Sequence, residues 1–193
     1  MLVYTTNKSQ FLKHTENNEI DERILASMEE KGLGRVSASE VASWRYSMQY
    51  MKNVLSGDDI PEDAGVAIEY AIPQTAKRID FILTGRNDDD RDTAVVIELK
   101  QWEKVYETDK YGVVETFVGG ANREMPHPSY QAWSYAALLE DFNESINSAN
   151  IVLQPCAYLH NCTTEAVLSD RYSDDLERAP AFLKSDSEKL RRF

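Results

Sequence analysis

The sequence predicts a mixed α/β (α+β) domain, because apolar residues recur with a helical period in some segments and with a strand period in others. The helical pattern covers residues 8–31, residues 37–57 and a segment from Pro128 to about Ile146. The strand pattern covers residues 66–72, 77–83, 94–100 and 151–159. In chain order these segments give helices, three strands, a hairpin at 102–118, a helix and a strand, and such a set buries its apolar faces by packing helices on a sheet.

The overall charge restricts the possible partners. The chain of 193 residues has 21 Lys and Arg against 33 Asp and Glu, a formal net charge of −12. A general electrostatic attraction to nucleic acid or to an anionic membrane is therefore excluded, although a local phosphate-handling site is not. The first ten residues resemble no signal peptide, and no apolar run is long enough to span a membrane, so we expect a cytoplasmic protein.

The segment before the strands divides into two parts. Residues 1–34 are predicted to form an N-terminal helical appendage that ends at Gly32-Leu33-Gly34. Ser37 and Glu40 then match a capping box, which predicts the start of a longer helix. This helix is expected to end at Gly57.

The first two strands predict a hairpin in which paired residue numbers sum to 149. Val66 then faces Leu83, Ile68 faces Phe81 and Tyr70 faces Ile79, and these six residues are predicted to form one apolar face. The same register places Glu69 opposite Asp80. Opposed carboxylates repel each other, so the register requires compensation by Arg78, by solvent or by a bound cation.

The third strand adds a second acidic residue to this region. Glu98 and Lys100 share one face of the strand, while Ile97 and Leu99 point to the other. Asp80 and Glu98 can therefore converge, with a lysine beside them. A few carboxylates with water suit Mg²⁺ or Mn²⁺, and the lysine can orient a water molecule or stabilise charge on a phosphate.

Two polar residues lie on the helix that follows. Gln131 and Tyr135 are four positions apart and share a helix face. An amide at the start of an apolar stripe requires hydrogen-bond partners, which a polar site would supply. The alternatives are that Gln131 reaches solvent from the first turn and that Tyr135 is a core residue.

These residues resemble the motif of the PD-(D/E)XK nucleases. Asp80 is followed 18 positions later by Glu98-Leu99-Lys100 at the end of an apolar strand, although Ile79 stands where the motif has proline. Gln131 and Tyr135 resemble the Gln-x-x-x-Tyr motif of RecB-like members. The resemblance covers residues 35–184 and implies a restriction-endonuclease-like αβββαβ core with an inserted hairpin.

The resemblance implies metal-dependent hydrolysis of phosphodiester bonds in DNA, with RNA as the alternative substrate. Asp80, Glu98 and the Leu99 carbonyl would bind Mg²⁺ or Mn²⁺, and Lys100 would act on the water or the phosphate. Gln131 and Tyr135 would line the same site. Glu40 is either a further metal ligand, as in many family members, or only the capping-box glutamate.

Glu69 is likewise a further metal ligand or a solvated strand residue, and its candidacy depends on the hairpin register alone.

Residues 68–83 and 127–142 also resemble the N-terminal region of bacterial nuclease–helicase proteins. In those proteins a helicase or Schlafen-like ATPase module follows, so residues 185–193 are expected to begin a linker or helix toward such a module. A role in phage defence is then expected. Two rival hypotheses are a catalytically idle docking or regulatory module of a larger ATPase and an acidic DNA-mimic inhibitor.

Overall fold

The computed structural model describes residues 1–73 and 75–193 and confirms a mixed α+β architecture. Six strands form the main sheet in the order β1-β2-β3-β4-β8-β9. Their bounds are Tyr4–Asn7, Gly65–Ala71, Arg78–Arg86, Asp92–Lys100, Val152–Leu159 and Ala181–Leu183, respectively. Strands β1 to β4 pair antiparallel with one another, whereas β8 runs parallel to β4 and to β9.

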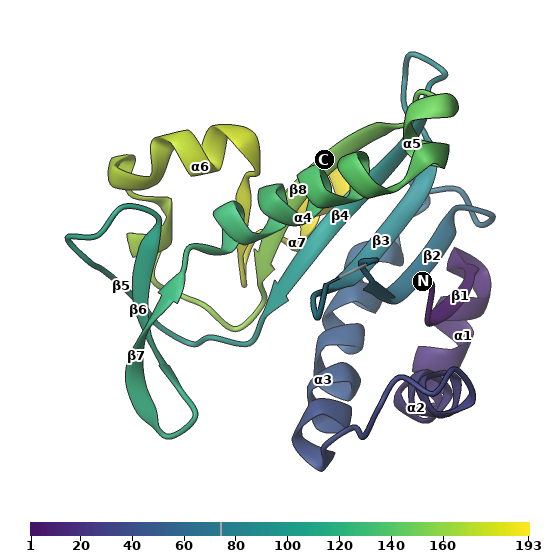
Figure 1. Ribbon diagram of the computed structural model, residues 1–193, viewed down its shortest axis with the longest axis horizontal. Coiled ribbons are helices and arrows are strands. Elements are labelled where there is room, and N and C mark those ends of the chain that lie inside the picture. Colours follow the sequence, from purple (N-terminus) through teal and green to yellow (C-terminus); the bar gives the residue numbers. More distant parts are fainter. Residues whose placement is uncertain (74) are drawn as a thin grey trace.

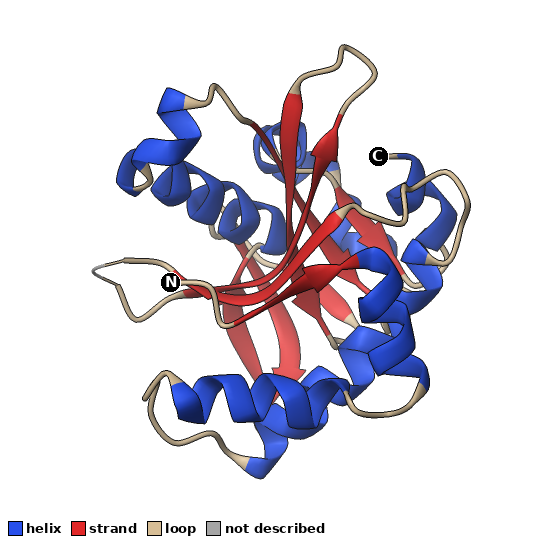
Figure 2. Ribbon diagram, turned by 90° about the vertical axis from the view of Figure 1, so that its right-hand side faces the viewer, coloured by secondary structure: helices blue, strands red, loops and turns tan. Residues whose placement is uncertain are grey.

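Helices cover both faces of this sheet (Figure 2). One core lies between the sheet and α1 (Lys8–Glu16), α2 (Ile20–Glu30) and α3 (Ala38–Leu55). The other lies between the sheet and α4 (Pro128–Phe142) with α5 (Glu144–Ser148). Each face of the strands is therefore buried, and a polar side chain on either face needs its own partner.

The helices begin largely where the sequence predicts. The Ser37 side chain accepts a hydrogen bond from the Glu40 amide at 3.2 Å, as expected at the start of α3. Pro128 is the first residue of α4. The helix predicted from Pro128 to about Ile146 is two helices, however. Asn143 lies between α4 and α5, and its side chain caps α5 by accepting a hydrogen bond from the Ser145 amide.

The predicted register of the first hairpin is confirmed, but the single apolar face is wrong. Val66 pairs with Leu83, Ile68 with Phe81 and Tyr70 with Ile79. Ile68 and Phe81 pack toward α3, whereas Tyr70 and Ile79 belong to the core beneath α4. The change of face falls between these pairs, at Glu69, whose φ of 58° lies in the left-handed region that side chains rarely adopt.

Residues 1–34, expected as a helical appendage, are built into the domain. Their helices are α1 and α2, separated by Asn18 with a left-handed φ of 57°. The short strand β1 is the edge of the main sheet, paired antiparallel with β2. Phe11 and Ile24 are fully buried in the same core as the strands. This segment therefore belongs to the hydrophobic core and is not a separate unit.

Between β4 and α4 the chain forms a second sheet, which extends away from the main sheet (Figure 1). It consists of β5 (Val105–Glu107), β6 (Val113–Val118) and β7 (Ala121–Pro126), all antiparallel. The predicted hairpin corresponds to β5 and β6. The third strand was not predicted, because residues 121–126 have no alternating apolar pattern and are almost all exposed.

The C-terminal residues pack on the domain. Two 3-10 turns (Glu165–Leu168, Asp170–Tyr172) and α6 (Ser173–Arg178) lead into β9. The final helix α7 (Ser187–Arg192) lies against α3, where the Arg191 guanidinium donates to the Asn53 and Val54 carbonyls. Asp186 precedes this helix, and its side chain makes no capping hydrogen bond.

Two further observations concern single features of the chain. Cys156 and Cys162 are both free and buried. Among the described helices, none combines the length and the apolar character that a bilayer crossing requires.

Candidate functional site

A cavity of about 430 Å³ lies between α3, α4 and the ends of the central strands. Helix α3 contributes polar and aromatic side chains, α4 contributes Gln131 and Tyr135, and the strands contribute carboxylates and backbone. The lining residues are Glu40, Ser43, Trp44, Ser47, Met48, Glu69, Ala76, Lys77, Arg78, Asp80, Leu99, Gln131 and Tyr135. Six of the residues predicted to form the site therefore line one cavity.

Asp80 lies where β3 and β4 separate. At this end of the two strands the last pair is Phe81 with Ile97, and Asp80 and Glu98 are the next residues beyond it. The Asp80 carboxylate accepts a hydrogen bond from the Leu99 amide at 2.8 Å. The side chain thus replaces the missing backbone partner, and this bond holds Asp80 beside the end of β4.

Glu98 and Lys100 lie on one face of β4, as the strand alternation predicts, and this face is the one covered by α4. Glu98 Oε1 accepts from Lys100 Nζ at 2.7 Å and from Gln131 Nε2 at 2.6 Å. Gln131 Oε1 also accepts from Lys100 Nζ at 3.1 Å, and Gln131 Nε2 donates to the Tyr135 hydroxyl at 3.0 Å. Glu98 and Lys100 do not line the cavity themselves and are joined to its wall through Gln131.

Ionisation of the two carboxyl groups on this side is disfavoured. Burial raises the pKa of Asp80, and the Lys100 charge and the Leu99 amide offset only part of this effect. Burial, followed by the charge of Asp80, raises the pKa of Glu98 to about 8. Burial and the charge of Glu98 also raise the pKa of Tyr135 to about 12. The charge of one lysine is therefore insufficient to hold the pKa values of both acids in their ordinary range.

Glu40 and Glu69 lie on the α3 side of the cavity and share one cation. The Arg78 guanidinium forms ion pairs with Glu40 and, at 2.8 Å, with Glu69. The Trp44 indole N–H donates to Glu69 at 2.7 Å. Burial and the charge of Asp80 raise the pKa of Glu69 to about 7. Both acids, predicted as possible metal ligands, are thus compensated here by Arg78.

A cation would fit best between Asp80 and Glu98. Glu98 Oε2 is buried and has no hydrogen-bond partner, so this oxygen has a free lone pair inside the protein. Over residues 1–73 and 75–193, no three or more His, Cys, Asp and Glu side chains are grouped closely enough to hold a metal ion. Two carboxylates would therefore need the Leu99 carbonyl and water to complete a shell of oxygen ligands.

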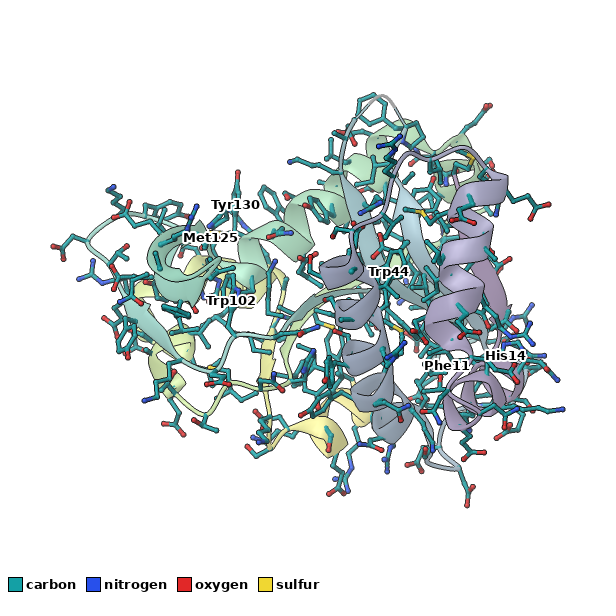
Figure 3. The ribbon with its side chains drawn as sticks, turned by 90° about the horizontal axis from the view of Figure 1, so that it is seen from below. Phe11, His14, Trp44, Trp102, Met125 and Tyr130 are labelled. Carbon is teal, nitrogen blue, oxygen red and sulfur yellow. The ribbon has the colours of Figure 1, made fainter. Side chains whose placement is uncertain are left out.

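Two residues at the site were not predicted as functional. Trp44 was not among the candidate residues, and Arg78 was considered only as one possible source of compensation. Trp44 follows Glu40 by four positions and Arg78 precedes Asp80 by two, so each spacing places the pair on one face. Figure 3 marks Trp44 on α3 and Trp102 nearer the three-stranded sheet. Lys100 Nζ lies 5.2 Å from the centre of the Trp102 ring.

Comparison with known proteins adds no relative. No protein-family model, curated protein or solved structure matches the chain.

Proposed function

We propose that the protein is a Mg²⁺- or Mn²⁺-dependent nuclease domain with a restriction-endonuclease-like core. The observation that carries the proposal is the hydrogen-bonded set formed by Glu98, Lys100, Gln131 and Tyr135, with Asp80 beside it. The sequence motif predicts these five residues as catalytic, and they come from three separate elements. The sheet order and the helix on each face are compatible with such a core.

Asp80 and Glu98 are the proposed ligands of the metal, together with the Leu99 carbonyl. Buried carboxylates with raised pKa values and an oxygen without a partner suit a hard divalent cation. When bound, the ion would supply Lewis-acid activation of a phosphodiester and of a water nucleophile. Glu40 and Glu69 could join as ligands only if Arg78 moved away from them.

The protein's own side chains have distinct roles in this proposal. Lys100 would orient the attacking water or stabilise the negative charge that develops on the phosphate. Glu98 and Gln131 fix its ammonium group, and the side chain is largely buried, so its position is restricted before substrate arrives. Gln131 in turn holds Glu98, and Tyr135 holds Gln131.

We further propose DNA as the substrate, with RNA as the alternative, and a downstream helicase or Schlafen-like ATPase module as partner in phage defence. A net charge of −12 disfavours strong binding of nucleic acid by this domain alone. Affinity would then come from the partner module or from a local basic group at the site.

The direct test is cleavage of labelled single- and double-stranded DNA and RNA with Mn²⁺, with Mg²⁺ or with EDTA. Wild type is compared with Lys100→Ala and with Lys104→Ala, an exposed lysine four residues further on. We expect metal-dependent cleavage in wild type and Lys104→Ala, and its loss in Lys100→Ala. Cleavage that persists in EDTA or in Lys100→Ala would contradict the proposed mechanism.

One observation favours a catalytically idle docking module as the second candidate. Glu40 and Glu69 are both paired with Arg78, and no group of three acids is preassembled among the described residues. An idle module would show no stabilisation by Mg²⁺ or Mn²⁺, whereas a nuclease should be stabilised by the ion that it binds. Thermal unfolding with and without Mn²⁺ therefore separates the two candidates.

A further inference from the structure

The cavity contains one lysine that the proposed mechanism does not use. Lys77 lines the cavity and is exposed at its mouth. Its backbone is fixed at the start of β3, where the Lys77 carbonyl accepts from the Ile72 amide at 3.0 Å and the Lys77 amide donates to Thr75 Oγ1 at 3.1 Å. The side chain therefore starts from a defined point at the edge of the cavity.

Lys77 differs from the other cations around the site in having no acidic partner. Arg78 is paired with Glu40 and Glu69, and Lys100 with Glu98. For Lys77, no carboxylate of the described chain lies within ion-pair distance, and its ammonium is 5.4 Å above the centre of the Tyr135 ring. An aromatic ring holds a cation without neutralising it, so the charge of Lys77 remains available to an external anion.

The cavity is lined by acidic side chains, so binding of an anionic substrate there requires an unpaired cation. Glu40, Glu69 and Asp80 line the same cavity, and each repels a phosphate group unless it is compensated. Tyr135, beneath the Lys77 ammonium, is hydrogen-bonded to Gln131, which contacts Glu98. Lys77 thus lies beside the proposed reaction centre, but it contacts neither Asp80, Glu98 nor Lys100.

We propose that Lys77 binds a phosphodiester group of a nucleic-acid strand next to the bond that is cleaved. This inference rests on the proposed function, because it assigns the cavity a polynucleotide ligand. A neighbouring phosphate is bound in the ground state and in the transition state alike, so Lys77 contributes to affinity and register and not to the chemical step.

The test is binding of a fluorescently labelled DNA strand in EDTA, measured by anisotropy between about 50 and about 200 mM salt. One lysine–phosphate contact changes the slope of log K against log salt by about one. Over this salt range the affinity of wild type should therefore fall about threefold more than that of Lys77→Ala. Lys77→Arg should retain the wild-type slope, because it retains the charge.

Lys13→Ala is the matched control. Lys13 is an exposed lysine on α1, with no ion pair among the described residues and no place in the cavity lining. Its removal should leave the slope unchanged. Equal loss of slope in Lys13→Ala and Lys77→Ala would overturn the proposal, since it would show only an effect of overall charge.

A mononucleotide separates two sources of phosphate. If Lys77→Ala weakens binding of the mononucleotide but leaves strand binding unchanged, the residue serves a free phosphate and the proposal is overturned. Absence of strand binding by wild type also overturns it. The binding measurement contains no metal, so failure of wild type to cleave with Mn²⁺ would reject the nuclease function while a Lys77-dependent slope would still support the strand site.

Discussion

Two acidic groups lie at the same end of the sheet, and they are compensated very differently. On the α3 side, Glu40 and Glu69 share the Arg78 guanidinium, and Glu69 also accepts from the Trp44 indole. On the α4 side, the buried Glu98 and the half-buried Asp80 lie next to a single lysine.

The difference lies in the number of unsatisfied acceptors. In the α3 group each acid is paired with Arg78, although burial raises the pKa of Glu69 to about 7. The α4 group raises the pKa of both acids and, in addition, leaves Glu98 Oε2 buried without a donor. A group that is costly in the absence of a ligand marks a functional site better than a count of acidic residues does.

The largest expected effect concerns cleavage by charge-neutralised variants of the two groups. Glu98→Gln should lower kcat/KM by about 10²–10³-fold, because it removes a proposed metal ligand and the partner of Lys100. Glu40→Gln should lower kcat/KM by less than about tenfold, since Arg78 already neutralises Glu40. Both variants are compared with Glu103→Gln, an exposed acid outside the cavity.

Equal losses in Glu98→Gln and Glu40→Gln would show that the two groups act together. The distinction between an α3 ion-pair network and an α4 reaction centre would then fail.

A smaller effect is expected on stability when Arg78 is removed. Arg78→Ala should lower the free energy of unfolding by about 2 kcal/mol, because it leaves the largely buried Glu69 charge without its cation. The side chain of Arg78 is one-third exposed, so solvent screens part of the loss. The corresponding decrease in Tm is about 4–8 °C.

The double variant Glu69→Gln/Arg78→Ala tests the cause of that decrease. It should recover most of the lost stability, since the uncompensated charge is gone. Arg86→Ala, which removes an exposed guanidinium paired with Asp90 and Asp92, should change stability by less than about 0.5 kcal/mol. No recovery in the double variant would mean that Arg78 stabilises by packing and not by charge.

A further effect is expected on the pH dependence of stability in EDTA. The folded-state pKa of Glu98 is raised to about 8, so the native protein holds a proton that the unfolded chain releases near 4.5. The resulting stabilisation is complete below pH 4.5 and is lost as the pH rises through about 8.

Chemical denaturation between these pH values measures this contribution. The slope for one proton is at most about 1.4 kcal/mol per pH unit, and Glu98→Gln should reduce it. Stability of wild type that rises over the same range would contradict the raised pKa.

The sequence predicted the pairings at the site better than it predicted their surroundings. The register of residues 66–72 against 77–83 follows from a period of two, which short strands preserve, and the structure confirms it. The change of face at Glu69 depends on one backbone dihedral angle and leaves no mark in the apolar pattern. Strand β1 was missed because Thr5, Thr6 and Asn7 pair at a polar edge.

The partners of the acids were harder to predict, because they depend on tertiary packing. The Gln131–Tyr135 pair follows from helical spacing and is found hydrogen-bonded. By contrast, Arg78 reaches Glu40 on α3 only because that helix lies against the end of the strands. Sequence patterns identify which residues share an element, whereas the compensation of a charge depends on how elements meet.

The most direct test of the central claim is a calorimetric titration of the protein with Mn²⁺. The account predicts binding in wild type and in Glu40→Gln, and loss of that binding in Asp80→Asn and in Glu98→Gln. Binding that survives in both Asp80→Asn and Glu98→Gln, or no binding by wild type, would contradict a metal-dependent site built on the Asp80–Glu98 pair.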